Sequence, residues 1–96
     1  RPQKSEVKGM RITREEVAGK LRDYLQHRIS LNELVDWAER AMMEGEFEEE
    51  HLEELREIVG RLGLADVRAF GLTWEDCEEF LRRLGYEVRV EVVARR

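Results

Sequence analysis

The stretch "SLNELVDWAERAMM", Ser30–Met43, decides the fold because it carries the full pattern of an amphipathic helix. Glu33 follows Ser30 at the spacing of a capping box, in which each side chain accepts a hydrogen bond from the other residue's backbone N–H. Apolar residues then recur every three or four positions, which places them on one helix face. They are Leu34, Val35, Ala38, Ala41 and Met42. The stretch predicts a helix that begins after Ser30, buries this face and is broken by Gly45.

The same chemistry precedes this helix. Thr13 and Glu16 form a second capping pair, ahead of another apolar stripe. The stripe consists of Val17, Leu21, Tyr24 and Leu25. Only a few residues around His27 separate the two patterns, so we expect the two helices to form an antiparallel hairpin.

Two further helices are predicted after Gly45. The third covers residues 47–62, with Gly63 in the position of a C-terminal cap. A short helical turn carrying Leu64, Val67 and Phe70 follows. The fourth helix begins after Thr73, with Asp76 in the first turn, where negative charge is favoured, and ends at Gly85.

The last segment, "YEVRVEVV", has a different period. Tyr86, Val88, Val90 and Val92 alternate with charged residues, which predicts a strand with one covered face. A single strand is unstable alone, so its partner is either the N-terminal segment, residues 7–12, or the same strand of a second copy. The predicted fold is mainly α: four amphipathic helices in a small bundle with a C-terminal strand. Residues 1–12 are a tail or a strand, and residues 13–96 are a single domain.

Composition narrows the function. The chain has 96 residues, 42% of them hydrophobic and 41% charged, with a formal net charge of -5. This charge disfavours binding to nucleic acid or to an anionic membrane, and suits a basic or neutral protein partner better. Cys77 is the one cysteine, which rules out an internal disulfide and favours a reducing, cytoplasmic location.

No phosphate-binding loop, zinc-ligand cluster or hydrolase triad is visible, and acidic neighbours disfavour a Cys77 thiolate. We therefore expect a non-enzymatic protein without a cofactor. One metal alternative remains: Glu48 and His51 have the spacing of paired ligands in di-iron bundles. The second Glu-x-x-His pair that such a site needs is lacking in the sequence.

The glutamate-rich stretch "EGEFEEEHLEELRE", residues 44–57, raises the question of a docking surface. Most of its glutamates fall on the side of the predicted third helix opposite the apolar stripe. A solvated helix face explains them, and so does a surface that attracts a basic partner. The predicted partner-binding residues are Glu49, Glu50, Glu53 and Glu57, with Trp37 or Met43 packing at the centre of the interface.

Two segments carry a family resemblance. "ITREEVAGKLRDYLQHRISLNELVDWAERAMMEGEF", residues 12–47, resembles the opening of colicin-type self-immunity proteins and of their uncharacterised bacterial relatives. "GLADVRAFGLTWEDCEEFLRRLGYEV", residues 63–88, resembles small bacterial proteins without an assigned activity. The resemblance implies a helical protein that neutralises a toxin by direct binding, although a final strand departs from that all-helical pattern.

Three hypotheses follow from the sequence. The first is an immunity-type or antitoxin-type neutraliser that binds a basic partner through the acidic face. The second is a homo-oligomeric assembly module joined through the C-terminal strand. The third is a metalloprotein that uses Glu48 and His51.

Overall fold

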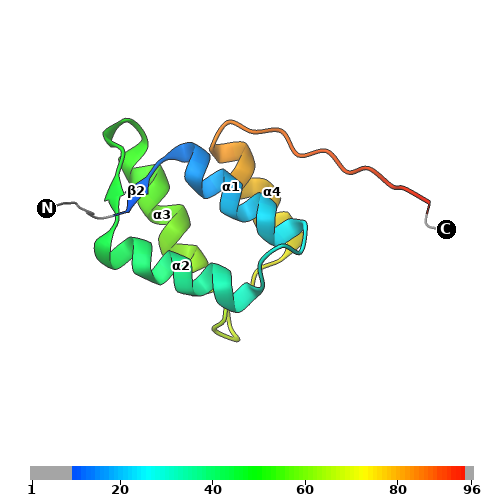
Figure 1. Cartoon of the computed structure of the whole chain (residues 1–96), viewed down its shortest axis with the longest axis horizontal. Helices are drawn as coiled ribbons and strands as arrows, with labels where there is room; N and C mark the ends of the chain where they lie inside the picture. Colours follow the sequence, from blue (N-terminus) through cyan, green and yellow to red (C-terminus); the bar gives the residue numbers. More distant parts are fainter. Residues whose placement is uncertain (1–9, 95–96) are drawn as a thin grey trace, which may run out of the picture.

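The computed structural model describes residues 10–94. Within this range the elements are β2 (Arg11–Ile12), α1 (Arg14–Leu25), α2 (Leu31–Glu44), β3 (Glu46–Phe47), the 3-10 turn η1 (Glu49–His51), α3 (Leu52–Leu62) and α4 (Trp74–Arg83). Figure 1 shows the four α-helices packed together, with β2 and β3 at one end of the bundle. The prediction of a mainly helical fold with four helices is confirmed.

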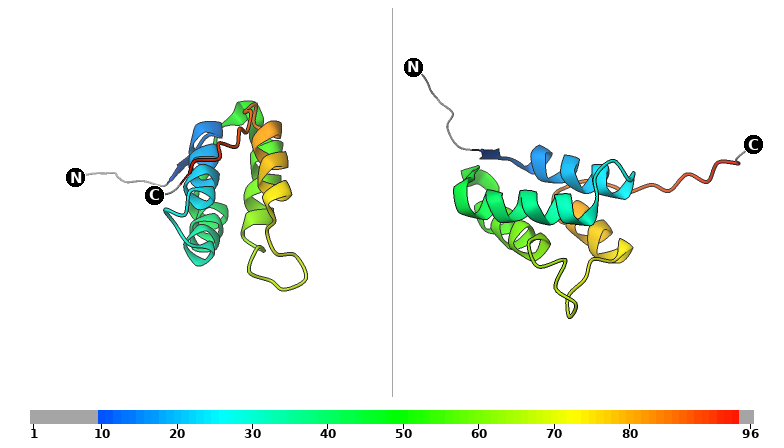
Figure 2. Two further views of the ribbon diagram at one scale, coloured as in Figure 1. Left: turned by 90° about the vertical axis from the view of Figure 1, so that its right-hand side faces the viewer. Right: turned by 60° about the horizontal axis from the view of Figure 1, so that its bottom comes forward.

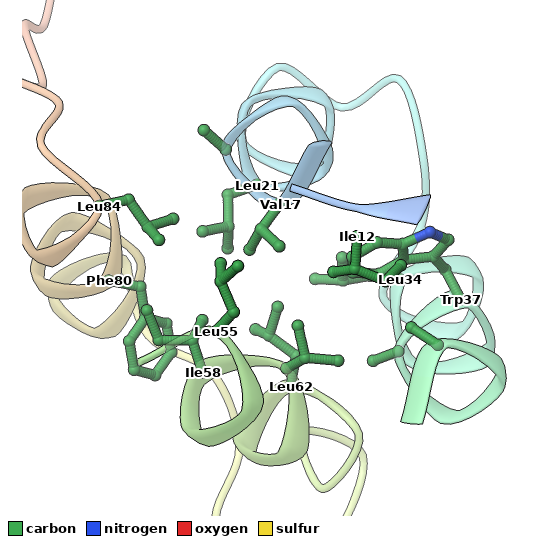
Figure 3. Close-up of a cluster of buried hydrophobic side chains, with 14 of the residues drawn as sticks. Ile12, Val17, Leu21, Leu34, Trp37, Leu55, Ile58, Leu62, Phe80 and Leu84 are labelled. Atoms are coloured by element: carbon green, nitrogen blue, oxygen red, sulfur yellow. The ribbon is translucent and has the colours of Figure 1, made fainter. Parts of the chain in front are cut away.

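One apolar cluster holds the four helices together. Figure 3 shows side chains from α1, α2, α3 and α4 pointing toward a common centre, joined by Ile12 of β2. Leu21, Leu34 and Leu55 are completely buried there. No polar or charged residue is buried in the described part of the chain, so burial of apolar surface is the main stabilising contribution of this core.

Side-chain caps are present at Thr13, Ser30 and Thr73, as reciprocal boxes at Ser30 and Thr73 and as a single hydrogen bond at Thr13. Ser30 and Glu33 form a reciprocal capping box, with nitrogen–oxygen distances of 3.1 Å and 2.8 Å. Thr73 and Asp76 form a second box. The Thr13 hydroxyl accepts a hydrogen bond from the backbone N–H of Glu16 at 3.1 Å. These local contacts fix where α1, α2 and α4 begin.

The N-terminal strand has a different partner from the one predicted. β2 pairs in parallel with β3, with Arg11 opposite Glu46 and Ile12 opposite Phe47. The pairing is possible because Gly45 lies against Ile12: a Cβ atom at position 45 would be 2.7 Å from Ile12 Cγ1. The prediction that this segment pairs with the C-terminal strand is therefore wrong for residues 10–12; residues 7–9 lie outside the described range.

The third helix begins later than predicted. α3 starts at Leu52, because Phe47 belongs to β3 and Glu48 has an extended backbone. The extended conformation brings the Glu48 carboxylate to the N-terminus of α1, where it accepts a hydrogen bond from the backbone N–H of Arg14 at 3.1 Å. Glu48 therefore satisfies a helix N–H that lacks a partner within its own helix.

The predicted turn after α3 is a series of turns within residues 63–70. Leu64, Val67 and Phe70 are each about half exposed. Arg61 holds this loop: its guanidinium donates to the backbone oxygens of Gly71 and Phe70, at 3.0 Å and 3.3 Å. It also lies 3.5 Å from the Asp76 carboxylate, so one side chain links α3, the loop and α4.

The C-terminal segment, residues 86–94, contains no strand in this structure. It runs past α1 and then leaves the helices as an extended chain, as both views of Figure 2 show. The predicted strand is therefore wrong for the single chain, and β2, which was one of its two expected partners, pairs with β3 instead. None of the helices within residues 10–94 has the length and hydrophobicity needed to cross a bilayer.

Candidate protein-binding surfaces

An arginine of α4 binds two of the glutamates of α3 and so separates the acidic residues of α3 into paired and unpaired ones. The Arg83 side chain forms a hydrogen-bonded ion pair with Glu54 through Nε, and a second with Glu57 at 2.7 Å through a terminal nitrogen. These two carboxylates hold the pKa of Arg83 above its usual value, chiefly through the Glu54 hydrogen bond. Glu57, one of the predicted partner-binding residues, is therefore engaged within the chain.

The other three predicted glutamates remain open to solvent. Glu49 and Glu50 lie in η1 and Glu53 lies in the first turn of α3, and all three are exposed. No ion pair joins any of them to another residue within the range 10–94. They leave a compact negative surface at the N-terminal end of α3.

Trp37 and Met43 lie in very different surroundings. Trp37 is 5% exposed and belongs to the core, with the Lys20 ammonium 5.7 Å from its ring centre. Its side chain is therefore not free to pack at the centre of an interface, as the sequence had suggested. Met43 is 81% exposed near the end of α2 and is open to a partner.

Glu48 and His51 lie together, as their spacing predicts. His51 Nδ1 is 3.4 Å from the Glu48 carboxylate, but the atoms are not aligned for a hydrogen bond, and Nδ1 is buried without such a bond. The same Glu48 oxygen already accepts from Arg14. Among residues 10–94 no set of three or more His, Cys, Asp or Glu side chains is placed to hold a metal ion.

The C-terminal segment is attached to the helices at its first residue, Tyr86. Gly85 has a positive φ of 92°, a conformation that glycine adopts without steric cost. The turn lets the backbone N–H of Tyr86 donate to Leu81 at 2.8 Å. The Arg14 guanidinium lies 5.9 Å from the Tyr86 ring centre, within the range of a cation–π contact.

From Tyr86 to Arg89, side-chain burial alternates every second residue, as the apolar pattern of the sequence does. Tyr86 and Val88 are partly buried against the core, whereas Glu87 and Arg89 are exposed. Val90 and Val92 continue the apolar series but are 69% and 92% exposed. One apolar face is thus covered over its first half and bare over its second half.

A groove runs between this segment and the helices. It has a volume of about 690 Å³ and is lined by residues 86–91, by α1 and by Trp74 of α4. On the α1 side the groove is lined by the small residues Ala18 and Gly19, which leave room for another chain. Trp74 is 42% exposed and also lines a second hollow, beside Ile29 and Leu72.

Cys77 is buried within the core. Burial, with a smaller contribution from the Asp76 charge, raises the pKa of its thiol to about 11. The thiol is protonated at neutral pH and has the environment of an unreactive structural cysteine.

Two features of these surfaces were missed by reasoning from the sequence. The first is the role of Arg83, whose partners Glu54 and Glu57 are 29 and 26 residues away. The groove beside Gly19 was not foreseen either; the only sequence signal for it is a glycine inside a helical pattern.

The chain matches no family model, and comparison with curated proteins and with solved structures finds no match either. The likeness to colicin-type immunity proteins stays a prediction from the sequence.

Proposed function

We propose that this chain is a protein-binding domain that contacts its partner through residues 86–94 by adding a strand to it. The observation that carries the proposal is the apolar face of this segment, which is covered at Tyr86 and Val88 and bare at Val90 and Val92. Exposed valines in this register are typical of a strand whose partner is another chain.

The backbone of the segment supports the same proposal. Within the described chain, no backbone hydrogen bond involves residues 87–94. Their N–H and C=O groups are free to form a ladder with an extended segment of another protein, while the valines fill pockets on one face. Tyr86 fixes the origin of the segment, which lowers the entropic cost of presenting it.

A binding role also suits the chemistry of the reactive groups. Glu48 caps α1, Asp76 caps α4 and Arg83 joins α3 to α4. The Cys77 thiol is buried and protonated. These groups have structural partners, and we propose binding rather than catalysis for this domain.

Site-specific photo-crosslinking tests the proposal. A photoreactive amino acid is placed at Val92, and in a matched control at Asp36, an exposed position on α2. In cells of the organism that encodes the chain, we expect a discrete adduct from position 92 and none from position 36. Absence of any adduct at position 92, with normal folding of the variant, would contradict binding through this segment.

A second candidate function is docking of a basic partner on the acidic surface, as the immunity-type hypothesis requires. It is favoured by Glu49, Glu50 and Glu53, which are exposed and form no ion pair within residues 10–94. Charge at such a surface speeds association and selects partners.

Charge reversal at these three positions tests the second candidate. The triple change to Lys should weaken association with a basic partner and reduce its dependence on salt. A control that reverses the exposed residues Asp36, Glu39 and Asp66 has the same net charge and should bind normally. Equal binding by both triple variants would exclude the acidic surface.

A further inference from the structure

We propose that the strand added to residues 86–94 is the same segment of a second copy, paired antiparallel with Val90 opposite the partner's Val90. The inference rests on the proposed function and names its partner. The apolar face of residues 86–92 continues from the covered half into the exposed half at Val90 and Val92. When two copies pair symmetrically, a single contact covers the exposed half of both.

Charge selects the register. Antiparallel pairing centred on Arg89 would set Arg89 against itself and Glu87 against Glu91, and like charges directly opposite destabilise a ladder. Centring on Val90 instead places Arg89 opposite the partner's Glu91, twice by symmetry. Parallel pairing of equivalent residues again sets like charges against each other.

Sterics remove the remaining favourable alternative. Centring on Val88 would also pair Arg89 with a glutamate, the partner's Glu87. However, it would place Val92 opposite Leu84, which is 2% exposed at the end of α4. A centre between two residues would place the apolar faces of the two copies on opposite sides of the ribbon. Only the Val90 centre pairs Val88 with the partner's Val92 and keeps every contact on accessible chain.

The groove beside α1 gives the partner's end a place to lie. In this register the partner's residues 92–94 run alongside residues 86–88, which form one wall of the groove. Ala18 and Gly19 leave space there, and Trp74 offers an apolar contact. This seat matters because an isolated two-stranded ribbon is marginally stable in water.

Variants with one added cysteine test the register. Val90→Cys should form an intermolecular disulfide under mild oxidation, since directly opposite residues have Cα atoms about 4.5–5.5 Å apart, within disulfide range. Arg89→Cys and Val88→Cys should not, because their symmetry mates would be about 8 Å and about 14 Å apart. The unmodified chain, whose Cys77 is buried, is the matched control.

A groove variant gives an independent readout. Gly19→Leu fills the groove without disturbing the core, because a Cβ at position 19 meets only the flexible end of Arg22, at 3.8 Å. We expect dimerisation to weaken about tenfold or more, by sedimentation, as loss of roughly 1.4 kcal/mol implies. Gly60→Leu, on α3 and outside the groove, is the control and should dimerise as the unmodified chain does.

The possible results test the register, the groove and self-association separately. Cross-linking led by Arg89→Cys or Val88→Cys would overturn the register, and undiminished dimerisation of Gly19→Leu would overturn the seat in the groove. A monomeric mass at high concentration, with no cross-linking from any variant, would overturn self-association. In that case a photo-adduct from position 92 to a different protein would leave the proposed function standing, whereas absence of any adduct would remove both.

Discussion

Gly45→Ala tests the close approach that lets β2 join the bundle. A Cβ at position 45 would be 2.7 Å from Ile12 Cγ1 and in conflict with the backbone oxygen of Ala41. Carbon atoms prefer about 3.5–4.0 Å, so the neighbours must move by roughly 1 Å. Neither moves freely. Ile12 is completely buried, and hydrogen bonds from Glu46 to Met10 and from Glu48 to Ile12 hold its strand against β3.

The magnitude follows from two opposing contributions. Overpacking of this kind costs about 1–3 kcal/mol. Replacing glycine by alanine returns about 0.4–1 kcal/mol by restricting the unfolded chain. The net loss is therefore about 1–2 kcal/mol, which lowers the Tm of a domain of this size by roughly 5–15 °C.

Gly60→Ala is the matched control. Gly60 lies inside α3, and a Cβ there meets only Met42 Cε, at 3.8 Å. The alanine should stabilise the helix by about 0.5–1 kcal/mol. Urea unfolding of the two variants, followed by circular dichroism, should therefore move in opposite directions. If Gly45→Ala matched the unmodified chain within about 0.5 kcal/mol, beyond the scatter of such measurements, the packing of Gly45 against Ile12 would be refuted.

Two further predictions concern α4. Hydrogen bonding to the backbone N–H of Thr73, aided by the Thr73 hydroxyl and Arg61, holds the pKa of Asp76 below its usual value. Asp76→Asn should therefore cost about 0.3–1 kcal/mol at pH 7. Urea unfolding at pH 7 and pH 3 should show this difference shrinking below about pH 4, because Asp76 of the unfolded chain takes up a proton there before Asp76 of the folded chain does. A difference that grew on acidification would contradict the assignment. Burial raises the pKa of the Cys77 thiol to about 11. At pH 8 a disulfide reagent should therefore react roughly 100-fold more slowly with the native chain than with the urea-unfolded chain. Equal rates for the two would show that the thiol is accessible.

The helices were predictable because their signals are local. Ser30 with Glu33 and Thr73 with Asp76 are separated by three positions, and each pair forms the contact that its spacing indicates. The apolar stripes require only the helical period, which the sequence displays directly. Local rules were therefore sufficient for the number and order of the helices and for most of their inward-facing residues. The exceptions on α2 are Trp37, which is buried, and Met42, which is exposed.

The errors concern residues whose partners are distant in sequence. Glu48 has a helix-forming neighbourhood, yet it caps a helix that begins 34 residues earlier. Arg83 has the position of a helix-dipole partner, yet it binds Glu54. The alternation after Tyr86 is a genuine strand pattern, but alternation specifies a covered face and does not specify which chain covers it.

The parallel pairing of β2 with β3 has a consequence for the order of events on the ribosome. Ile12 is synthesised early, but its ladder partner Phe47 emerges 35 residues later, after α1 and α2. Arg83, in turn, cannot join Glu54 until 29 further residues have been synthesised after Glu54. We therefore expect the α1–α2 hairpin to form first during synthesis, the β2–β3 pair to close over it next, and α4 to dock last, because loop closure delays contacts between distant residues.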